Sequence, residues 1–360
     1  MAGRLWLSRA APIVAAGCVL LTACEDRKDG AAADGGMFDS GNTSDSATCP
    51  GTAWSGWLTD APSASSLAYA PSFGGYLVLG SHAVGFQHAA VSLDGVSFRR
   101  LSGMPPGSGG LACSPFVCVI EGWQSYSGAD WTPIVDPDDI GGTTQLRFWH
   151  AVWDGSQFIA FREDRVYTSS QFLIAFSRGQ TMTATPVGGG SASAAVIGGA
   201  RKWGETWVSA RDNTVLFSSA PVPLNWQVVT LPTTLRIGSV AKSPDTWVAV
   251  AVDGSMGLPM SEVWTSPDGL AWTRSDIIVG VLSSVAWAGT DFVLVGPETV
   301  VVEGGRVSTV QGAAYRGKPG AWTRGGYSDD TSCFHLSGSQ VVVANGRTFI
   351  LGSSELFGVP

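Results

Sequence analysis

The chain has 360 residues, of which 44% are hydrophobic and only 14% are charged. Its 29 acidic residues outnumber its 21 basic residues, so the formal net charge at pH 7 is -8. An acidic chain of this kind is not attracted to phosphate backbones, which excludes nucleic acid as a partner and also argues against a basic membrane-binding face.

Residues 1–23 have the organisation of an export signal. Arg4 and Arg9 supply positive charge, and residues 10–21 form an apolar stretch that is too short to span a bilayer comfortably. The stretch ends in Leu21-Thr22-Ala23-Cys24, which resembles a bacterial lipobox. The resemblance implies that Cys24 becomes the lipidated first residue of the mature chain and anchors it in a membrane. The alternative is an ordinary signal peptide followed by a chance cysteine.

Residues 24–48 follow as a polar segment. After Cys24 they are rich in Glu, Asp, Gly, Ala and Ser and contain almost no large apolar side chains. Such a segment cannot bury enough apolar surface to fold, so we predict a disordered tether. Its root-mean-square span would be on the order of 25–30 Å. We therefore expect a protein that is attached to the bacterial cell envelope, at a periplasmic face or on the cell surface.

A sequence repeat organises residues 49–360. Its clearest copy is residues 285–296, where two apolar strands flank a turn. The first aromatic or β-branched residue after each turn recurs at a period of roughly 45 residues. These anchor residues are Tyr76, Val117, Phe158, Trp207, Trp247, Phe292 and Val341. A repeat of this size cannot bury its own apolar faces and has to stack on its copies, which predicts an all-β domain of seven repeats with four short strands each.

Two of the repeats end in the same turn motif. Residues 266–272 fit Ser-x-Asp-Gly-x-x-Trp, and residues 92–98 fit it with Phe in place of Trp. Residues 125–131 keep the spacing but lack the Asp. Asp-Gly is a strong hairpin signal because Asp accepts hydrogen bonds from its own turn backbone and Gly tolerates positive φ. The motif residues are Ser92, Asp94, Gly95, Phe98, Ser266, Asp268, Gly269 and Trp272.

These turns, at this period, resemble the Asp-box or BNR repeat of sialidase-like β-propellers. The resemblance covers about residues 50–360 and implies a seven-bladed β-propeller of four-stranded antiparallel blades, in which the Asp-boxes are structural. The last repeat supplies three strands, at 334–337, 341–344 and 348–351, and residues 51–54 resemble residues 269–272. We therefore expect residues 52–59 to be the outer strand of the last blade and to close the ring.

Four cysteines lie beyond the first 24 residues, an even number that suits an oxidising compartment. Cys113 and Cys118 flank a turn between adjacent strands. Cys49 precedes the expected closing strand, and Cys333 precedes the blade that this strand would complete. The repeat register thus predicts disulfides Cys113–Cys118 and Cys49–Cys333, with unpaired buried thiols as the alternative. The spacing lacks a Cys-x-x-Cys pair and a nearby His, so we expect neither a metal nor a cofactor.

Catalytic motifs are the weak part of the resemblance. Sialidase-like enzymes carry their first active-site arginine in an Arg-Ile-Pro motif, whereas this chain has Arg236-Ile237-Gly238 in a different blade. The sequence has no Gly-x-Ser-x-Gly, no metal-binding His pair and no phosphate loop. A glycosidase needs two carboxylates across a cleft, and no motif here fixes such a pair.

One group of residues is a candidate binding site. In propellers, the turns between second and third strands share a face with the loops that enter first strands. Those positions hold Arg147, Arg162, Arg211 and Arg236, with Trp123 in the same kind of turn one blade earlier. Several arginines around a funnel would suit a carboxylate or phosphate group. The alternative is that each arginine pairs with a neighbouring acid such as Glu163 or Asp212, and that Trp123 caps the sheet rather than stacking on a sugar.

The sequence therefore favours a lipid-anchored, monomeric propeller that binds a protein or glycan partner without catalysis. The rival hypothesis is a sialidase-like or other glycoside hydrolase or lyase that acts on an anionic glycan. A third possibility is an assembly factor, because Asp-box propellers also occur in scaffolding roles.

Overall fold

The computed structural model describes residues 64–81, 87–101, 110–169, 176–187, 199–220, 222–252, 260–297, 299–303, 306–310, 313–324, 326–328, 333–335, 340–352 and 356–359. Contacts divide the chain into two units, residues 1–47 and 48–360, and the described residues all belong to the second unit. Several expected features lie outside these ranges: the export signal, the lipobox, the tether, Cys49 and the closing strand at 52–59. Within them, no helix has the length and apolar character needed to cross a membrane.

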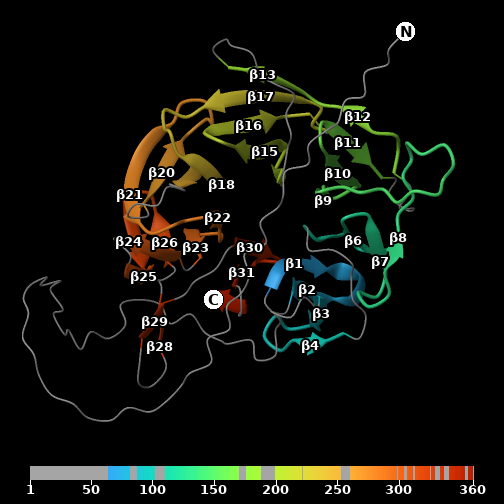
Figure 1. Cartoon of the computed structure of the whole chain (residues 1–360), viewed down its shortest axis with the longest axis horizontal. Helices are drawn as coiled ribbons and strands as arrows, with labels where there is room; N and C mark the ends of the chain where they lie inside the picture. The colour runs from blue at the N-terminus through green and yellow to red at the C-terminus, as the bar shows by residue number, and fades with distance from the viewer. Residues whose placement is uncertain are drawn as a thin grey trace, which may run out of the picture. The chain divides into compact units, whose positions relative to one another are not determined.

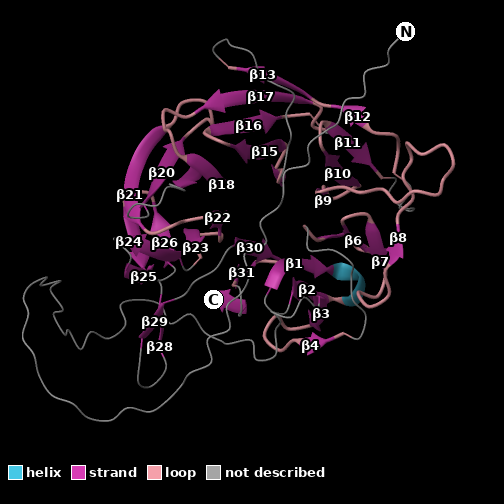
Figure 2. Ribbon diagram, viewed as in Figure 1, coloured by secondary structure: helices cyan, strands magenta, loops and turns pink. Residues whose placement is uncertain are grey.

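The described part of the chain consists of strands joined by turns, with one 3-10 turn at Pro71–Phe73 (Figures 1 and 2). Strands consecutive in sequence pair antiparallel into small sheets, which we call blades. Blade 1 contains β1 (Ala64–Ala70), β2 (Gly75–Ser81), β3 (Gln87–Ser92) and β4 (Arg99–Arg100). Blade 2 contains β5 (Ala112–Cys113), β6 (Cys118–Ile120), β7 (Trp123–Ser125) and β8 (Thr132–Pro133). Blade 3 contains β9 (His150–Trp153), β10 (Phe158–Arg162), β11 (Arg165–Thr168) and β12 (Gln180–Thr181).

The next three blades follow the same order. Blade 4 contains β14 (Arg201–Trp203), β15 (Thr206–Arg211), β16 (Thr214–Ser218) and β17 (Asn225–Thr230). Blade 5 contains β18 (Arg236–Lys242), β19 (Trp247–Val252), β20 (Met260–Ser266) and β21 (Thr273–Val279). Blade 6 contains β22 (Ser284–Trp287), β23 (Phe292–Gly296), β26 (Ala313–Lys318) and β27 (Ala321–Arg324). The hairpin of β24 (Thr299–Glu303) and β25 (Arg306–Val310) is inserted between β23 and β26.

Blade 4 has a fifth strand, which comes from an earlier part of the chain. After β12 the chain leaves blade 3, and β13 (Thr183–Pro186) pairs parallel with the outer strand β17. The pairing is reinforced by the Thr183 hydroxyl, which donates to the Asn225 side-chain oxygen at 2.7 Å. The outer edge of blade 4 is therefore covered by residues that precede the blade in sequence.

The prediction of seven four-stranded blades is wrong in number. The described residues form six blades of four or five strands, and the C-terminal sheet has only three, β30 (Gln340–Ala344), β31 (Arg347–Leu351) and β32 (Leu356–Val359). The assignment of strands in the last repeat is also wrong by one strand, because residues 334–337 were expected to begin the sheet and β30 begins it instead. Cys333–His335 forms β29 and pairs with β28 (Gly326–Ser328) instead of joining the sheet. Apolar residues alone did not reveal which short strand begins the sheet. Closure by residues 52–59 remains a prediction.

Hydrophobic clusters join each blade to the next, since the blades are buried on both faces. Between blades 3 and 4, for example, Phe161 packs against Trp207 with ring centroids 6.1 Å apart. The C-terminal sheet takes part in the same way on both sides. Val341 belongs to a cluster with Val293 of blade 6, and Phe349 belongs to a cluster with Tyr76 of blade 1. The sheets thus follow one another around a shared centre (Figure 1).

The two Ser-x-Asp-Gly turns have one geometry. Asp268 accepts bonds from the backbone N–H groups of Leu270 and Ala271 at 2.8 and 3.0 Å, and the Ser266 hydroxyl accepts from Gly269 N–H at 2.8 Å. Residues 92–98 repeat these bonds, and there they hold the pKa of Asp94 down at about 2. Gly269 has φ +81°, and a Cβ there would lie 2.9 Å from the Phe217 ring of the preceding blade. The turn therefore requires glycine.

The degenerate turn at residues 125–131 keeps this geometry without the Asp. Ser127 takes its place and accepts bonds from Ala129 and Asp130 N–H at 3.2 and 3.1 Å. The Trp131 indole N–H donates to the Gly128 carbonyl at 3.0 Å, as the Trp272 indole does to the Gly269 carbonyl. A shorter hydroxyl side chain is thus sufficient for the bonds that the carboxylate makes elsewhere.

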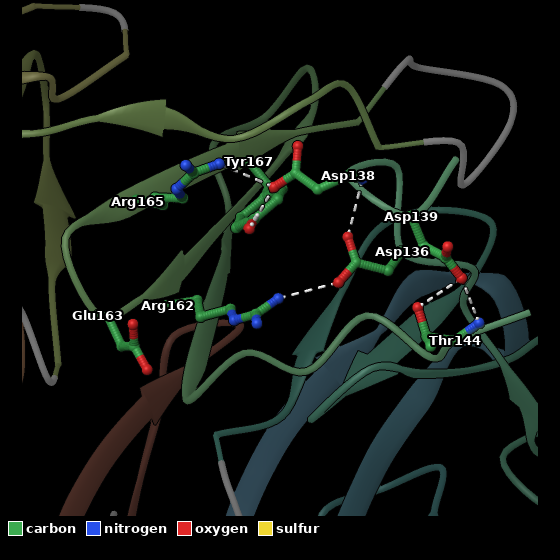
Figure 3. A pocket seen from close by; sticks show the side chains of 8 residues that line it. All are labelled: Asp136, Asp138, Asp139, Thr144, Arg162, Glu163, Arg165 and Tyr167. Carbon is green, nitrogen blue, oxygen red and sulfur yellow. Dashed lines mark hydrogen bonds and ion pairs between the residues drawn. The ribbon is translucent and has the colours of Figure 1, made fainter. Parts of the chain in front are cut away.

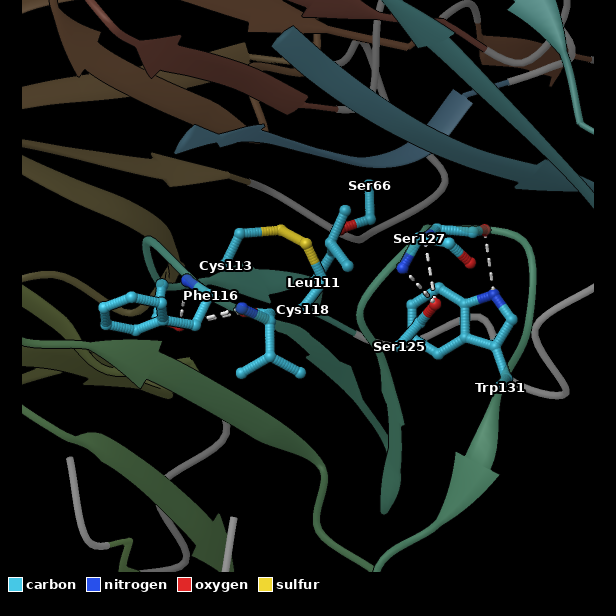
Figure 4. The surroundings of a disulfide bond; sticks show 11 residues. Ser66, Leu111, Cys113, Phe116, Cys118, Ser125, Ser127 and Trp131 are labelled. Atoms are coloured by element: carbon cyan, nitrogen blue, oxygen red, sulfur yellow. Dashed lines mark hydrogen bonds between the residues drawn. A yellow bond between two sulfur atoms is a disulfide. The ribbon is translucent and has the colours of Figure 1, made fainter. Parts of the chain in front are cut away.

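The predicted Cys113–Cys118 disulfide is confirmed (Figure 4). It joins β5 and β6 where Cys113 and Cys118 stand opposite each other, across a turn in which the Ser114 hydroxyl accepts from Phe116 and Val117 N–H. The predicted partner of Cys333 is Cys49, which lies outside the described residues, so that pairing remains a prediction.

Candidate functional site

A polar hollow of about 450 Å³ lies at one end of blade 3 (Figure 3). Part of its lining comes from the connection between β8 and β9, and the rest comes from the β10–β11 turn and the start of β11. The lining residues are Asp136, Asp138, Asp139, Thr144, Arg162, Glu163, Arg165 and Tyr167. For blade 3, a loop that enters a first strand and a turn between second and third strands do share one face, as expected from the sequence.

Arg162 is not free to bind a ligand anion on its own. Its Nη1 donates to Asp136 Oδ2 at 2.9 Å, and the Asp136 side chain is only 11% exposed. Asp136 Oδ1 also accepts from the backbone N–H of Asp138 at 2.9 Å. The pair therefore ties the β10 end to the β8–β9 connection, which makes Arg162 a part of the loop's support.

Asp138 joins three separate parts of the hollow's surroundings. The Tyr167 hydroxyl and Arg165 Nη1 donate to its Oδ2 at 2.8 and 3.0 Å, and Gly179 N–H donates to its Oδ1 at 3.3 Å. Partial burial alone would raise the pKa of Asp138, but these bonds and the charge of Arg165 outweigh it and hold the pKa below its usual value. Burial and the bond to Asp138 raise the pKa of Tyr167 to about 12.

Asp139 organises the tip of the β8–β9 connection. Its carboxylate accepts from Gly141 N–H, from Thr143 N–H and from both the N–H and the hydroxyl of Thr144, at 2.8–3.0 Å. These bonds, led by the one from the Thr144 hydroxyl, hold the pKa of Asp139 well below its usual range. An isolated bridge between Val135 and Gln145 closes the base of the loop. The carboxylate therefore serves the loop, and Ile140 stands at the tip with 94% of its surface exposed.

The charge of the hollow is negative. Four carboxylates and two guanidinium groups line it, and 2 − 4 gives −2. Both arginines are already paired with acids. Among the residues that the structure describes, no group of three or more His, Cys, Asp and Glu side chains is placed to hold a metal ion. The arrangement therefore gives a shaped, charged surface whose groups largely satisfy one another.

The other arginines predicted from the sequence lie on blades 3 to 5. Arg147 is exposed just before β9, and Arg236 is exposed at the start of β18. Arg211 ends β15, with its Nε 3.7 Å from Asp212 Oδ2, at a distance that permits only a weak ion pair. The Ile237 N–H donates to the Asp212 carbonyl at 2.6 Å, which brings the Arg211 turn beside the Arg236 strand.

Trp123 begins β7 and is half-buried. It packs against the cluster of blades 1 and 2 that contains Leu77 and Ile120. This contact favours the interpretation that Trp123 caps the sheet.

The sequence patterns did not predict the part of the hollow that comes from the β8–β9 connection. Asp136, Asp138 and Asp139 stand in the run Asp-Pro-Asp-Asp-Ile-Gly-Gly-Thr-Thr at residues 136–144. Its density of Asp, Gly and Thr is a signal for a structured turn, although nothing in the repeat period says that Asp136 meets Arg162. The turns after β6, β10 and β15 also place an acid at positive φ, at Glu121, Glu163 and Asp212.

Comparison with known proteins gives structural neighbours only. No family model matches the chain, and no curated protein sequence does. The extracellular domain of a one-component system from B. thetaiotaomicron matches with a TM-score of 0.55 at 9% identity, over 84% of this chain and 39% of that chain. This chain therefore spans well under half the length of that neighbour.

Two WD40 proteins match over most of their length. The Pan2 WD40 domain of Neurospora crassa has a TM-score of 0.51 at 9% identity, and the match covers 83% of this chain and 90% of that chain. The RRP9 WD40 repeats have a TM-score of 0.51 at 12% identity, over 84% and 96%. At identities this low, the similarity shows a shared fold and does not show a shared function. The chain is an all-β propeller with four-stranded antiparallel blades.

Proposed function

We propose that this propeller is a non-catalytic binding or scaffold module of the bacterial cell envelope, held to a membrane by a lipid on Cys24 and facing a protein or glycan partner. The fold supports a binding role, since propellers present many loops on a rigid frame. The single observation that carries the non-catalytic part is the pairing in the blade 3 hollow, where Arg162 and Arg165 bond to Asp136 and Asp138.

The protonation of the hollow supports binding over glycoside hydrolysis. A hydrolase needs one carboxylic acid that keeps its proton near neutral pH, which requires a raised pKa. The pKa values of Asp138 and Asp139 are instead lowered, by donors from Tyr167 and from the Thr144 region respectively. Both groups are therefore ionised at neutral pH and occupied by protein donors.

The exposed arginines remain the proposed contact points for an anionic partner. All three arginines, Arg147, Arg211 and Arg236, are exposed on blades 3 to 5. Among the described residues, Arg211 has only the weak 3.7 Å contact with Asp212, and Arg147 and Arg236 have no ion pair with an acid. A guanidinium suits bidentate contact with a carboxylate or phosphate. Arg162, by contrast, is proposed to act indirectly, by holding the Asp136 loop.

Glycan-array and pull-down binding would test this partner surface. The informative variant is the double change Arg211→Ala and Arg236→Ala, and its matched control is Arg274→Ala, an exposed arginine on β21 that pairs with Glu262 at 2.7 Å. We expect the double variant to lose binding and the control to keep it. Equal binding by all three proteins would remove these arginines from the function. Turnover of a fluorogenic sialoside by the wild type, lost in the double variant, would favour the hydrolase hypothesis.

The proposal has three further parts: membership of the Asp-box family, the lipid anchor, and closure of the ring by residues 52–59. The shared geometry of the turns at 92–98 and 266–272 supports the first. The anchor is supported by the Leu21-Thr22-Ala23-Cys24 sequence. Changing Cys24 to Ser should release the protein from membrane fractions, and continued membrane association of that variant would contradict a lipid on Cys24.

A further inference from the structure

The first strand of each sheet pairs on one side only, so its other edge faces the middle of the propeller. Side chains on these strands bond to the backbone of a neighbouring first strand or its approach. The links are Ser66 to Leu111 N–H at 2.8 Å (labelled in Figure 4), His150 to the Ala200 carbonyl at 2.9 Å, Ser239 to the Val285 carbonyl at 3.4 Å and Ser284 to Val341 N–H at 3.1 Å. The centre is thus lined by small polar links.

Arg201 departs from this pattern. It begins β14 of blade 4, and its Nη1 donates to the Val285 carbonyl on β22 of blade 6 at 3.3 Å. The bond thus joins two blades that are separated by blade 5, and Ser239 of blade 5 donates to the same carbonyl. A guanidinium on blade 4 therefore reaches the inner strand of blade 6 and shares an acceptor that already has one donor.

The charge of Arg201 is not balanced by an acid among the described residues. The neighbouring Lys202 lies 3.9 Å from Asp154, whereas Arg201 has the Val285 carbonyl as its bonded partner. Surrounding atoms desolvate the guanidinium and lower its pKa, although part of the residue stays accessible. A partly buried cation with most of its N–H donors free is costly unless something pairs with it.

A second donor on the same strand is also unsatisfied. Residues 201 and 203 share one face of β14, because side chains alternate along a strand. The Trp203 Nε1 is buried and has no hydrogen-bond partner in the described structure. The guanidinium thus has one acceptor among the described residues, and the indole N–H two residues along the strand has none. A ligand that brings oxygen atoms and negative charge would supply the acceptors and the counter-charge that Arg201 lacks.

We propose that Arg201 is the centre of an oxyanion-binding site in the middle of the propeller, for a carboxylate or phosphate group held by the guanidinium fork. Bidentate bonding to such a group matches guanidinium geometry and supplies the missing charge. The site is separate from the outer arginines proposed to contact a partner. Because a small inorganic ion is enough to occupy it, its test does not depend on whether the outer arginines bind a partner.

Calorimetric titration of the folded protein with inorganic phosphate and with acetate, at ionic strength fixed with chloride, tests the site. The wild type should bind at least one of the two ions saturably at one site per chain, and the responsive ion distinguishes phosphate from carboxylate. Arg201→Lys keeps a positive charge without the fork and should bind at least about tenfold more weakly, because a bidentate charge-assisted contact is lost. Arg274→Lys, on the exposed surface of the next blade and paired with Glu262, is the matched control and should bind like the wild type.

Absence of saturable binding of both ions by the wild type would overturn the proposal. Loss of binding in Arg236→Lys but not in Arg201→Lys would also overturn it and would move the anion to the outer surface. If Arg201→Lys fails to fold, the thermal midpoint of the wild type is the second measurement. This midpoint should rise with the bound ion and not with chloride, and Arg274→Lys should show the same rise.

Discussion

The ring of Phe349 lies 5.1 Å from the ring of Tyr76, so the C-terminal sheet packs directly on the first blade. Gly95, at positive φ in the turn of blade 1, lies beside the same phenylalanine, just as Gly269 of blade 5 lies beside Phe217 of blade 4. The three-stranded sheet therefore stands in the position that a preceding blade occupies elsewhere, and side-chain packing joins the two ends of the sheet series.

Truncation of Phe349 should destabilise the whole propeller. Its side chain is 1% exposed within the cluster that joins β31 to blade 1, and Phe→Ala changes in such cores cost about 3–5 kcal/mol. Urea unfolding of Phe349→Ala measures this. Val343→Ala on the adjacent strand, where 39% of the side chain is exposed, is the control and should change stability by less than about 1 kcal/mol. Similar losses in both variants would show that Phe349 has no special role in joining the ends.

His150 should make stability depend on pH between about 6.5 and 4. Burial lowers its pKa from 6.5 to about 4, despite the bond to the Ala200 carbonyl, and the charge of Arg201 acts in the same direction. As pH falls through this window the unfolded chain takes up the proton first. The stabilisation is therefore complete above pH 6.5 and is lost toward pH 4, by on the order of 2–4 kcal/mol.

Urea unfolding of the wild type and of His150→Gln across this range checks the assignment. The variant should show a flatter profile, because glutamine does not titrate. A wild-type protein that is equally stable at pH 4.5 and pH 7, or a variant with the same slope as the wild type, would refute it.

Removal of the Cys113–Cys118 disulfide should have a moderate effect. The two cysteines are five residues apart, so the bond closes a short loop, and the chain-entropy model gives about 2 kcal/mol for a loop of this size. Thermal unfolding of the double variant Cys113→Ala and Cys118→Ala should show a lower midpoint. Wild type in a strong reductant is the comparison and should show the same lower midpoint. A double variant as stable as the oxidised wild type would mean that the bonds to the Ser114 hydroxyl hold the turn without the disulfide.

Arg162→Met should loosen the loop of the blade 3 hollow. The change leaves the Asp136 carboxylate, 11% exposed, without its charged donor, and an unsatisfied buried acceptor costs about 1–3 kcal/mol. Hydrogen exchange should become faster in residues 136–144. Arg147→Met is the matched control on the same connection, since Arg147 is exposed. Unchanged exchange in Arg162→Met would show that Asp139 and its own bonds hold the loop without help.

Local patterns in the sequence predicted local structure well. The turns at 92–98 and 266–272 and the Cys113–Cys118 pair depend on residues within seven positions of each other, and Asp-Gly and turn chemistry act at that range. The last repeat failed because residues 333–335 and 340–344 are both short β-forming runs. Which of them joins a sheet is decided by the partner strand that is available, as with β28 and β29.

The candidate site was predictable only in part. The period placed Arg162 on the correct face, since it ends the second strand of its repeat. Its partner Asp136 comes from 26 residues earlier, through a connection whose path the repeat does not encode. No sequence pattern pointed to Arg201, because its role depends on a bond to Val285, which lies 84 residues away and two blades further along the propeller.

The parallel strand β13 has a consequence for cooperativity. It leaves blade 3 and is bonded to the far edge of blade 4, where Thr183 N–H and Val187 N–H donate to the carbonyls of Leu224 and Val228. The outer strand of blade 3 therefore cannot peel away at its C-terminal end without first releasing blade 4. These two blades should open as one unit in native-state hydrogen exchange, while blades that no such shared strand connects retain the freedom to open singly.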